Sequence, residues 1–374
     1  MMKPPEKVLL IIRRSLGDVL AISPVVDILH RRFSDVSIDL LVNKDTVPAA
    51  CLLDGINKII PFDDNLLQNK TLPAVVMQIK LIGEIFRKYD LAIAFTTNER
   101  SNVYAYLAGR TSVGMMEPNR LKNWWHRILL DEGYRFNHKS HILENNLEAL
   151  HILGITIERI LLSASYSGKA RQRVQEMLNA FTVGPFIIFH PTGRFLCKSY
   201  PPKNRNILLH LLDSLDVPII VTGGKSEIDL KFASEIPALK KVHSLIGKIS
   251  LEECAALTDM SLAYVGVDTF NCHLASAFNK PMFVMLGPTI PEIWSPWSNA
   301  LQTAGSRSQT VQTYGCITLF QSSIECAPCG HSKCGDSDRY SLCMDDIDPY
   351  TVFDAVKRRL SELKPENHED AKTT

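Results

Sequence analysis

Short apolar runs rich in β-branched residues alternate with segments of helical periodicity along most of the chain. The runs cover residues 7–13, 37–43, 90–95, 185–190, 217–224, 240–245, 260–266 and 281–286. Uninterrupted apolar runs of about five residues are typical of strands that are buried on both faces, as in parallel sheets covered by helices. The alternation of such strands with helices predicts an α/β protein with doubly wound sheets.

A polar stretch near residues 163–169 interrupts the alternation once. With 374 residues, the chain is long enough for two domains. We therefore expect one doubly wound domain over residues 1–165 and a second over residues 166–374. An amphipathic last helix is predicted at 351–363, before a polar tail that is expected to be disordered.

Charge and hydropathy limit the partners and the location that we expect. The net charge is +1, so no overall attraction to nucleic acid is predicted. The first apolar run covers only residues 8–12 and ends at two arginines, which is unlike a signal peptide. No apolar stretch reaches the ~20 residues of a transmembrane helix. We expect a cytoplasmic protein, peripheral to a membrane at most, with nine reduced cysteines.

Polar residues and glycines follow five of the predicted strands at the point where each strand ends. These segments are RRSLGD (13–18), HPTGRFLCK (190–198), TGGKSE (222–227), VDTFNCH (267–273) and GPTIPEIWSPW (287–297). Ligands of open α/β sheets bind in the crevice at the carboxyl ends of the strands. Because all five segments occupy such positions, we expect them to form one ligand crevice.

Each of these segments also has a purely structural explanation. An aspartate near a helix start, such as Asp18 or Asp268, is about as often only a helix cap, and Gly223-Gly224 alone is a turn signal. A single His273 is more often a core histidine. The occurrence of all five segments in order favours the crevice, and helix starts near Lys198 favour an anion in it. The chain lacks GxxxxGK[ST] and GxGxxG, so we expect neither a P-loop NTPase nor a standard dinucleotide oxidoreductase.

Taken together, these segments resemble glycosyltransferase family 9, the ADP-heptose–lipopolysaccharide heptosyltransferases. The matching segments run in order from residue 7 to residue 300. KDTVPAA (44–50), VGVD (265–268) and IWSPW (293–297) are most similar to the heptosyltransferase III branch. The resemblance implies a GT-B fold, in which two Rossmann-like domains face each other across a cleft. It also implies that the last helix packs back on the first domain.

The resemblance implies inverting transfer of heptose from ADP-L-glycero-β-D-manno-heptose to the inner core of lipopolysaccharide, at the cytoplasmic face of the inner membrane. This reaction needs a carboxylate that removes the acceptor proton, and cations or N–H groups that hold the leaving diphosphate. Asp18 is the expected base, Lys198 the expected cation, and Glu227 the expected ligand of the ribose. The full set expected to bind the donor is Thr192, Gly193, Lys198, Gly223, Glu227, Asp268, Thr269, Phe270, Asn271 and His273. We expect no cofactor and no metal in this chemistry.

Two residues depart from the family pattern. Phe270 stands where glycine or another small residue is usual, and Tyr200 stands where tryptophan is usual. Neither change removes a charge, but Phe270 leaves the donor preference open. Two alternatives therefore remain, namely a GT-B transferase that uses another nucleotide sugar or glycan acceptor, and a non-catalytic sugar-nucleotide-binding protein.

A basic and aromatic segment in the first domain is a candidate for binding a phosphorylated acceptor. It comprises NRLKNWWHR (119–127), followed by His138, Lys139 and His141. Most such clusters are structural, and we consider a structural role about twice as frequent as an acceptor patch.

Four cysteines near the C-terminus form a second cluster, namely Cys326, Cys329, Cys334 and Cys343. One CxxC pair with two further cysteines is compatible with a tetrahedral structural zinc site. Reduced structural thiols are the favoured interpretation, because the second pair lacks CxxC spacing.

Overall fold

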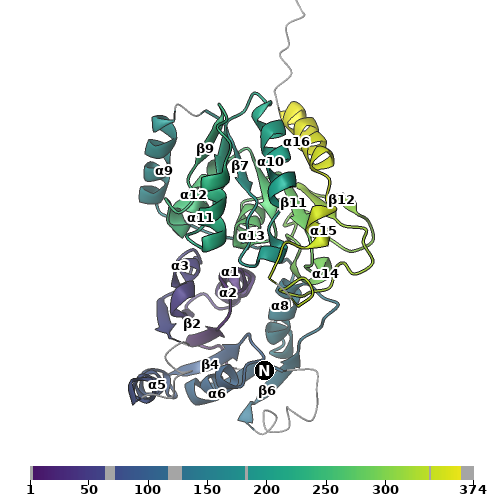
Figure 1. Cartoon of the computed structure of the whole chain (residues 1–374). Helices are drawn as coiled ribbons and strands as arrows, with labels where there is room; N and C mark the ends of the chain where they lie inside the picture. The colour runs from purple at the N-terminus through teal and green to yellow at the C-terminus, as the bar shows by residue number, and fades with distance from the viewer. Residues whose placement is uncertain (1–2, 64–71, 117–128, 182–183, 337, 364–374) are drawn as a thin grey trace, which may run out of the picture.

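The computed structural model describes residues 3–63, 72–116, 129–181, 184–336 and 338–363. Two α/β domains are stacked one above the other, with the N-terminal half of the chain below and the C-terminal half above (Figure 1). Among the described residues, each domain is built on its own predominantly parallel sheet. The predicted α/β class and the parallel sheets are therefore confirmed.

The first sheet has the strand order β3-β2-β1-β4-β5-β6 within the described chain, and every neighbouring pair is parallel. Its strands are β1 (Lys7–Ile12), β2 (Ser37–Asn43), β3 (Lys58–Phe62), β4 (Tyr89–Ala94), β5 (Gly109–Met116) and β6 (Glu132–Arg135). Successive residues of central β1 point to opposite faces: Val8 and Leu10 join one core, and Leu9 joins the other. Both faces of the sheet are therefore covered.

The helices of the first domain divide between these two cores. They are α1 (Leu16–Leu20), α2 (Ser23–Arg32), a 3₁₀ turn η1 (Lys44–Thr46), α3 (Val47–Ala50), α5 (Leu72–Ile85), α6 (Glu99–Ala108) and α8 (Ile142–Ile152). The helices α1, α2, α3 and α8 contribute buried side chains to the core that faces the second domain. The helices α5 and α6 contribute to the core on the other face of the sheet.

The second sheet has the order β12-β13-β11-β10-β7-β8-β9 in the part of the chain that the structure describes. Its strands are β7 (Ile187–His190), β8 (Ile219–Val221), β9 (Val242–Ser244), β10 (Ala263–Val267), β11 (Met282–Leu286), β12 (Val311–Tyr314) and β13 (Ile317–Gln321). The β12–β13 pair is antiparallel, and the other neighbouring pairs are parallel. The sequence analysis predicted no strand after residue 286, so this edge hairpin is a new finding.

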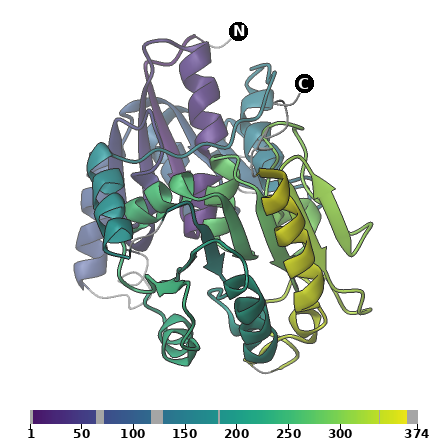
Figure 2. The same cartoon turned by 90° about the horizontal axis from the view of Figure 1, so that it is seen from above.

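The helices of the second domain include the final helix, which was expected to pack on the first domain. The helices and 3₁₀ turn are α9 (Gly168–Ala180), η2 (Leu196–Lys198), α10 (Pro202–Asp213), α11 (Glu227–Glu235), α12 (Leu251–Met260), α13 (Phe270–Ala277), α14 (Pro291–Trp294), α15 (Leu342–Asp345) and α16 (Pro349–Leu363). Val352, Val356 and Leu360 of α16 are buried in the same core as the apolar side chains of α10. The helix predicted at 351–363 therefore packs on α10 and β11 of the second domain rather than back on the first (Figures 1 and 2).

The connection between α8 and α9 changes its contacts from one domain to the other. The Ser165 N–H donates to the carbonyl of Leu52 in the first domain at 2.8 Å. The Ser167 N–H donates to Glu252 in the second domain at 2.9 Å. This change supports the domain boundary that we propose between residues 165 and 166.

Two side-chain amides of the second domain bind the backbone of this connection, and we call these four hydrogen bonds the clasp. Asn299 accepts from the Leu162 N–H and donates to the Leu162 carbonyl, both at 2.9 Å. Gln302 does the same with Ile160, at 2.7 and 2.9 Å. Leu274 of α13 and Trp297 also join the core of the first domain, so the interface is partly apolar.

Two sequence predictions concern features beyond this architecture. The basic and aromatic segment 119–127 lies outside the described residues. Among the helices that the structure describes, none combines the length and the hydropathy needed to cross a bilayer.

Candidate active site

A cavity of about 610 Å³ lies between the two domains, at the carboxyl ends of β1 and β10, and we call it the interdomain cavity. Its lining comprises Arg14, Ser15, Leu16, Gly17, Asp18, Asn43, Asp45, Thr46, Arg194, Phe195, Lys198, Asp268, Thr269, Phe270, His273 and Trp294. The structure thus brings together Asp18 from the first domain with Lys198, Asp268, Thr269, Phe270 and His273 from the second.

The two carboxylate oxygens of Asp18 have different surroundings. Ser15, rather than Asp18, is the N-cap of α1. Asp18 Oδ2 accepts from the Ser15 N–H at 3.1 Å and from the Ser15 hydroxyl at 2.5 Å. Oδ1 is buried, has no hydrogen bond within the described chain, and lies 3.6 Å from Nη1 of Arg14. One oxygen therefore fixes the helix start, and the other takes part in no hydrogen bond within the described chain.

Lys198 and Asp268 form an ion pair in the wall of the interdomain cavity. Lys198 Nζ lies 2.9 Å from Asp268 Oδ2, which also accepts from the Thr289 hydroxyl at 2.6 Å. Burial is the largest single effect and opposes both charges, but the nearby charges and hydrogen bonds together outweigh it, with Lys198 and Asp268 acting on each other and His273 and Thr289 adding to the effect on Asp268. The pKa of Lys198 is therefore raised, and the pKa of Asp268 is lowered. Both groups are charged at neutral pH and largely neutralise each other.

His273 lies between this ion pair and the first domain. Its Nε2 is 3.7 Å from Asp268 Oδ1, and a Cβ built on Gly17 would lie 3.5 Å from its Cδ2. Burial lowers the pKa of His273, and the nearby carboxylates of Asp268 and Asp18 only partly oppose this effect. His273 is therefore a neutral imidazole at neutral pH.

The start of helix α13 is open toward the interdomain cavity. Thr269 is its N-cap, but the Thr269 side chain makes no capping hydrogen bond. Cys272 and His273 donate their N–H groups to the Thr269 carbonyl, whereas no acceptor within the described residues receives the N–H groups of Phe270 and Asn271. Unpaired N–H groups at a helix start attract an anion, and a diphosphate fits this chemistry.

The other residues predicted to bind the donor lie beside the interdomain cavity rather than in its lining. The Thr192 hydroxyl donates to Asp229 at 2.6 Å, the Gly193 N–H donates to Ser199 at 2.9 Å, and Asn271 Nδ2 lies 3.0 Å from His190 Nδ1. Gly223 packs against Asp229, and Glu227 is exposed at the start of α11. Their donor-binding roles stay predictions, and the hydrogen bonds of Thr192 and Gly193 are already used within the protein.

Sequence reasoning missed several residues of the interdomain cavity. Arg194 is exposed and has no ion pair in the described part of the chain, so its charge is available to a ligand. The Arg14 guanidinium lies 6.0 Å from the centre of the Trp294 ring. Both arginines lie in segments after strand ends that the sequence analysis had already identified. Their positive charge at such a position could have marked them as candidate ligands of the diphosphate.

The two departures from the family pattern are both accommodated. Phe270 is half-buried, lines the interdomain cavity and packs against the core of the first domain. Tyr200 is fully buried, and its hydroxyl donates to the Ile347 carbonyl at 2.6 Å. Of the two residues that differ from the family pattern, Phe270 is therefore the one placed to contact a donor bound in the interdomain cavity.

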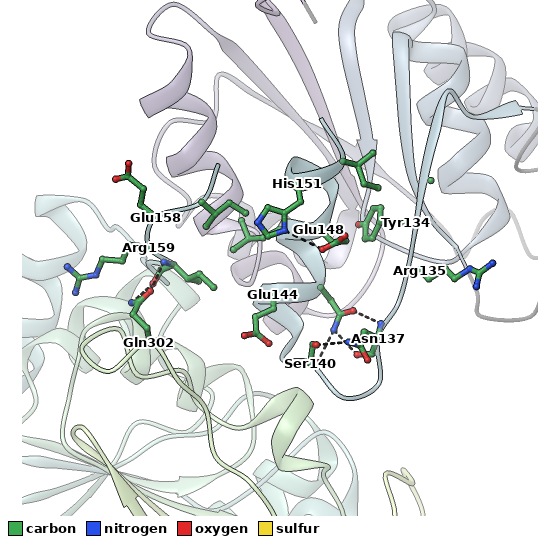
Figure 3. Close-up of a pocket in the computed structure, with 16 residues that line it drawn as sticks. Tyr134, Arg135, Asn137, Ser140, Glu144, Glu148, His151, Glu158, Arg159 and Gln302 are labelled. Atoms are coloured by element: carbon green, nitrogen blue, oxygen red, sulfur yellow. Dashed lines mark hydrogen bonds and ion pairs between the residues drawn. The ribbon is translucent and has the colours of Figure 1, made fainter. Parts of the chain in front are cut away.

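A second cavity, of about 770 Å³, lies beside helix α8, and we call it the α8 cavity. Its lining comprises Gly133, Tyr134, Arg135, Asn137, Ser140, Glu144, Asn145, Leu147, Glu148, His151, Ile152, Ile157, Glu158, Arg159, Ile160 and Gln302 (Figure 3). None of the predicted donor-binding residues is among them. Some of its charged groups have partners within the protein, as Arg159 has with the Asn299 carbonyl and His151 with Glu148.

The described residues bring three metal-ligand types together at one place, namely Asp268, Cys272 and His273. Lys198 already neutralises Asp268 there. The four C-terminal cysteines do not form such a group in the described chain, since no three of their thiols lie within 4.8 Å of one another. Burial and the neighbouring thiols raise the pKa of Cys343. This arrangement is compatible with reduced thiols, and zinc binding stays a prediction to be tested.

The chain is similar to known proteins over most of its length. The chain is 26% identical over 294 residues to lipopolysaccharide heptosyltransferase 3 of Escherichia coli, with 76% of this chain and 84% of the relative covered. The protein of that name from strain K12 is 26% identical over 307 residues, with 79% and 87% covered.

Solved structures share the fold at lower sequence identity. The glycosyl transferase family 9 protein of Veillonella parvula DSM 2008 has a TM-score of 0.75 at 17% identity, with 95% of this chain and 97% of that chain covered. The E. coli ADP-heptose lps heptosyltransferase II has a TM-score of 0.71 at 16% identity, with 96% and 99% covered. The predicted GT-B fold is therefore confirmed. The model of glycosyltransferase family 9 (heptosyltransferase) matches residues 79–318, more than half of the chain, and the chain belongs to this family.

Proposed function

We propose that this protein transfers heptose from ADP-heptose to the inner core of lipopolysaccharide with inversion at the anomeric carbon, as a heptosyltransferase of the III type. The observation that carries the proposal is the position of Asp18, opposite the Lys198–Asp268 pair and the open start of α13 across one cavity. The family and the two relatives named lipopolysaccharide heptosyltransferase 3 support the substrates.

In the proposed reaction, Asp18 is the general base. An acceptor hydroxyl attacks the anomeric carbon of the heptose, and its proton moves to Asp18 Oδ1. The bond between the anomeric carbon and the diphosphate oxygen breaks, and ADP leaves with the bonding electron pair. Asp18 Oδ2 keeps its hydrogen bonds to Ser15 throughout, so the base does not need to reorient.

The departing diphosphate needs positive charge and N–H donors. The N–H groups at the start of α13 supply part of this, and Arg194 supplies a charge that no described acidic residue neutralises. Lys198 contributes less net charge, because Asp268 is its partner. This set requires no metal ion, and full transfer is expected in the presence of a chelator.

The nucleoside is proposed to extend from the interdomain cavity across the carboxyl end of β7 to that of β8. These strands are neighbours in the second sheet, and Gly223 and Glu227 follow β8. A Glu227 carboxylate that accepts from the ribose hydroxyls fits the exposed position of this side chain. We further propose a cytoplasmic location, peripheral at the inner membrane, because the acceptor is anchored in a membrane.

Two assays with the purified protein test the proposal. In a thermal shift comparison, ADP-heptose is expected to raise the melting temperature more than UDP- or GDP-sugars do. In a transfer assay, the protein is expected to add one heptose to a heptose-deficient inner-core acceptor, as detected by mass spectrometry.

The outcomes separate the alternatives. Protection by another nucleotide sugar, with transfer from it, would assign a different donor. Binding of ADP-heptose without transfer to any core acceptor would favour a non-catalytic binding protein. Loss of one heptose from lipopolysaccharide of a deletion strain would identify the acceptor in the cell.

A further inference from the structure

Helix α5 exposes a continuous apolar face that the described parts of the chain leave uncovered. The exposed side chains are Leu72 (77% exposed), Val75 (47%), Val76 (42%), Ile79 (64%) and, just after the helix, Phe86 (54%). These positions follow helical periodicity, so they lie along one face of the helix. Five large apolar side chains on one exposed face are unusual for a domain surface without a partner.

The opposite face of α5 holds the helix on the first domain. Ala74, Leu81 and Ile85 are buried in the core that α5 shares with α6. The helix is therefore anchored by one apolar stripe while it presents a second stripe to the outside. Unlike most surface helices, α5 is apolar on both sides.

The charges beside the exposed stripe are mainly positive. Lys80 and Lys88 are exposed on or just after the helix, and Arg87 follows it with its guanidinium donating to the Gly109 carbonyl at 2.6 Å. Glu84, the acidic residue of α5, pairs with Lys58 at 2.7 Å and so adds no net negative charge. Apolar side chains flanked by lysine and arginine are the pattern of helices that lie in the interface of an anionic membrane.

The position of α5 keeps the interdomain cavity free. Figure 1 shows α5 at the outer end of the first domain, on the side away from the second domain. Its core lies on the other face of the first sheet from the core that contains α1. A surface that contacts α5 would therefore leave the interdomain cavity open.

We propose that the exposed face of α5 docks on an anionic phospholipid surface. The proposal deepens the proposed function and rests on it in one respect, since a lipid-anchored acceptor gives an enzyme reason to bind a bilayer. A second copy of the chain fits this face less well. A two-fold dimer through α5 would bring Lys80, Arg87 and Lys88 close to the same cations of the partner.

Vesicle flotation with the full-length protein tests the proposal. The vesicles are pure phosphatidylcholine or phosphatidylcholine with phosphatidylglycerol, and they contain no sugar acceptor. The double variant Val76→Ser/Ile79→Ser is compared with the wild type and with Leu301→Ser, which replaces a leucine of the second domain that is 57% exposed. A third variant, Lys80→Gln/Lys88→Gln, removes charge without changing the apolar stripe.

We expect binding to the anionic vesicles and weaker binding to the neutral ones. Because each exposed aliphatic side chain contributes at least about a tenfold factor when it is buried, the Val76→Ser/Ile79→Ser protein should bind roughly a hundredfold more weakly. The lysine variant should lose most of the preference for anionic vesicles, and Leu301→Ser should bind like the wild type.

Equal flotation of wild type and Val76→Ser/Ile79→Ser would overturn the proposal. So would a wild-type dimer in light scattering that this double variant converts to a monomer, because a second copy would then cover the face. The assay involves no transfer. Failure of the docking proposal with transfer intact, or the reverse, would therefore show which of the two proposals is wrong.

Discussion

The interdomain cavity and the α8 cavity are similar in size but differ in how their polar groups are organised. In the interdomain cavity, Asp18, an arginine with no ion pair among the described residues and an open helix start line one space from both domains. In the α8 cavity, the labelled charged side chains project in different directions from α8, β6 and the connection to α9 (Figure 3). In the larger α8 cavity the polar and charged groups do not point toward one common position. The site is therefore identified by groups that face one space, and not by the volume of the cavity.

The origin of this difference lies in the sheet. In each of the two sheets the carboxyl ends of the parallel strands meet at one edge. Residues that follow β1 in the first sheet and β10 in the second line one cavity, because these two edges face each other across it. The α8 cavity is built from the side of a helix and a connecting segment, whose side chains diverge. Five variants, one of them measured at two pH values, test whether the two regions differ in function as they do in structure.

The largest effect is expected for Asp18→Asn. The asparagine oxygen can still accept from Ser15, so helix α1 should keep its start and the melting temperature should change little. The amide cannot take the acceptor proton, and the loss of a general base typically costs ~10²–10⁴-fold in rate. Steady-state turnover and ADP-heptose binding measure the two consequences. A variant with more than about a tenth of wild-type turnover would place the base elsewhere and remove the main distinction between the two cavities.

Lys198→Ala should destabilise the protein as well as slow it. The substitution leaves the Asp268 carboxylate buried with Thr289 and a neutral His273 as its nearby partners. Breaking such a pair typically costs about 3–5 kcal/mol, less any relief from water that reaches the site. If Lys198 only bound the donor, its substitution by alanine would leave the melting temperature nearly unchanged.

Arg194→Ala is the matched variant for this measurement. Arg194 is exposed, so its loss should leave the melting temperature unchanged while it weakens ADP-heptose binding by about tenfold. Denaturant unfolding and donor titration of both proteins give the comparison. If Lys198→Ala is as stable as the wild type, the ion pair contributes little to the fold.

A smaller effect is expected from pH, through His141 at the start of α8. Its Nδ1 accepts from the Leu143 N–H, and its Nε2 donates to the Ser295 carbonyl of the second domain. Burial lowers the pKa of His141 to about 3, although the bond to Ser295 opposes this. The unfolded chain has a histidine pKa near ~6.5, so it binds a proton first as the pH falls.

The folded protein should therefore lose stability between pH ~6.5 and pH ~3, by about 2 kcal/mol at pH 5 relative to neutral pH. Denaturant unfolding at pH 7.5 and pH 5 measures this difference. His141→Gln should reduce it by a similar amount, while the other buried histidines contribute equally in both proteins. An unchanged difference in His141→Gln would show that His141 does not hold the domains together in the neutral form.

The smallest effect is expected for Glu148→Gln in the α8 cavity. Glu148 is exposed, and in the part of the chain that the structure describes its ion pair is with the exposed His151 on the same helix, so stability should stay within about 0.5 kcal/mol of the wild type. Transfer and donor binding should be unchanged in the same assays as for Asp18→Asn. A clear loss of transfer would make the α8 cavity part of the site and end the distinction between the two regions.

Most of the fold and the centre of the site could be predicted from the sequence, because both follow from buried strands and their ends. Asp18, Lys198 and His273 are far apart in the chain. Asp18 follows β1 of the first sheet, and Lys198 and His273 follow β7 and β10 of the second, each after the carboxyl end of its strand. The Lys198–Asp268 pairing could not be predicted, because it depends on how two loops approach each other across 70 positions.

Other features escaped prediction for identifiable physical reasons. Helix α16 has a clear apolar stripe, but a stripe does not specify which domain it covers. Strand β12 is short and half-exposed at a sheet edge, so it lacks the buried apolar run that revealed the other strands. His141 was grouped with a basic patch by proximity in sequence, whereas it is buried and joins the two domains.

The clasp of Asn299 and Gln302 on residues 160–162 has a consequence for motion between the domains. Each side-chain amide pairs with both backbone groups of one residue, as a neighbouring strand would. Sliding of one domain over the other along this edge would break all four hydrogen bonds. The clasp therefore fixes the register of the two domains along this edge, and with it the register in which Asp18 stands relative to the start of α13.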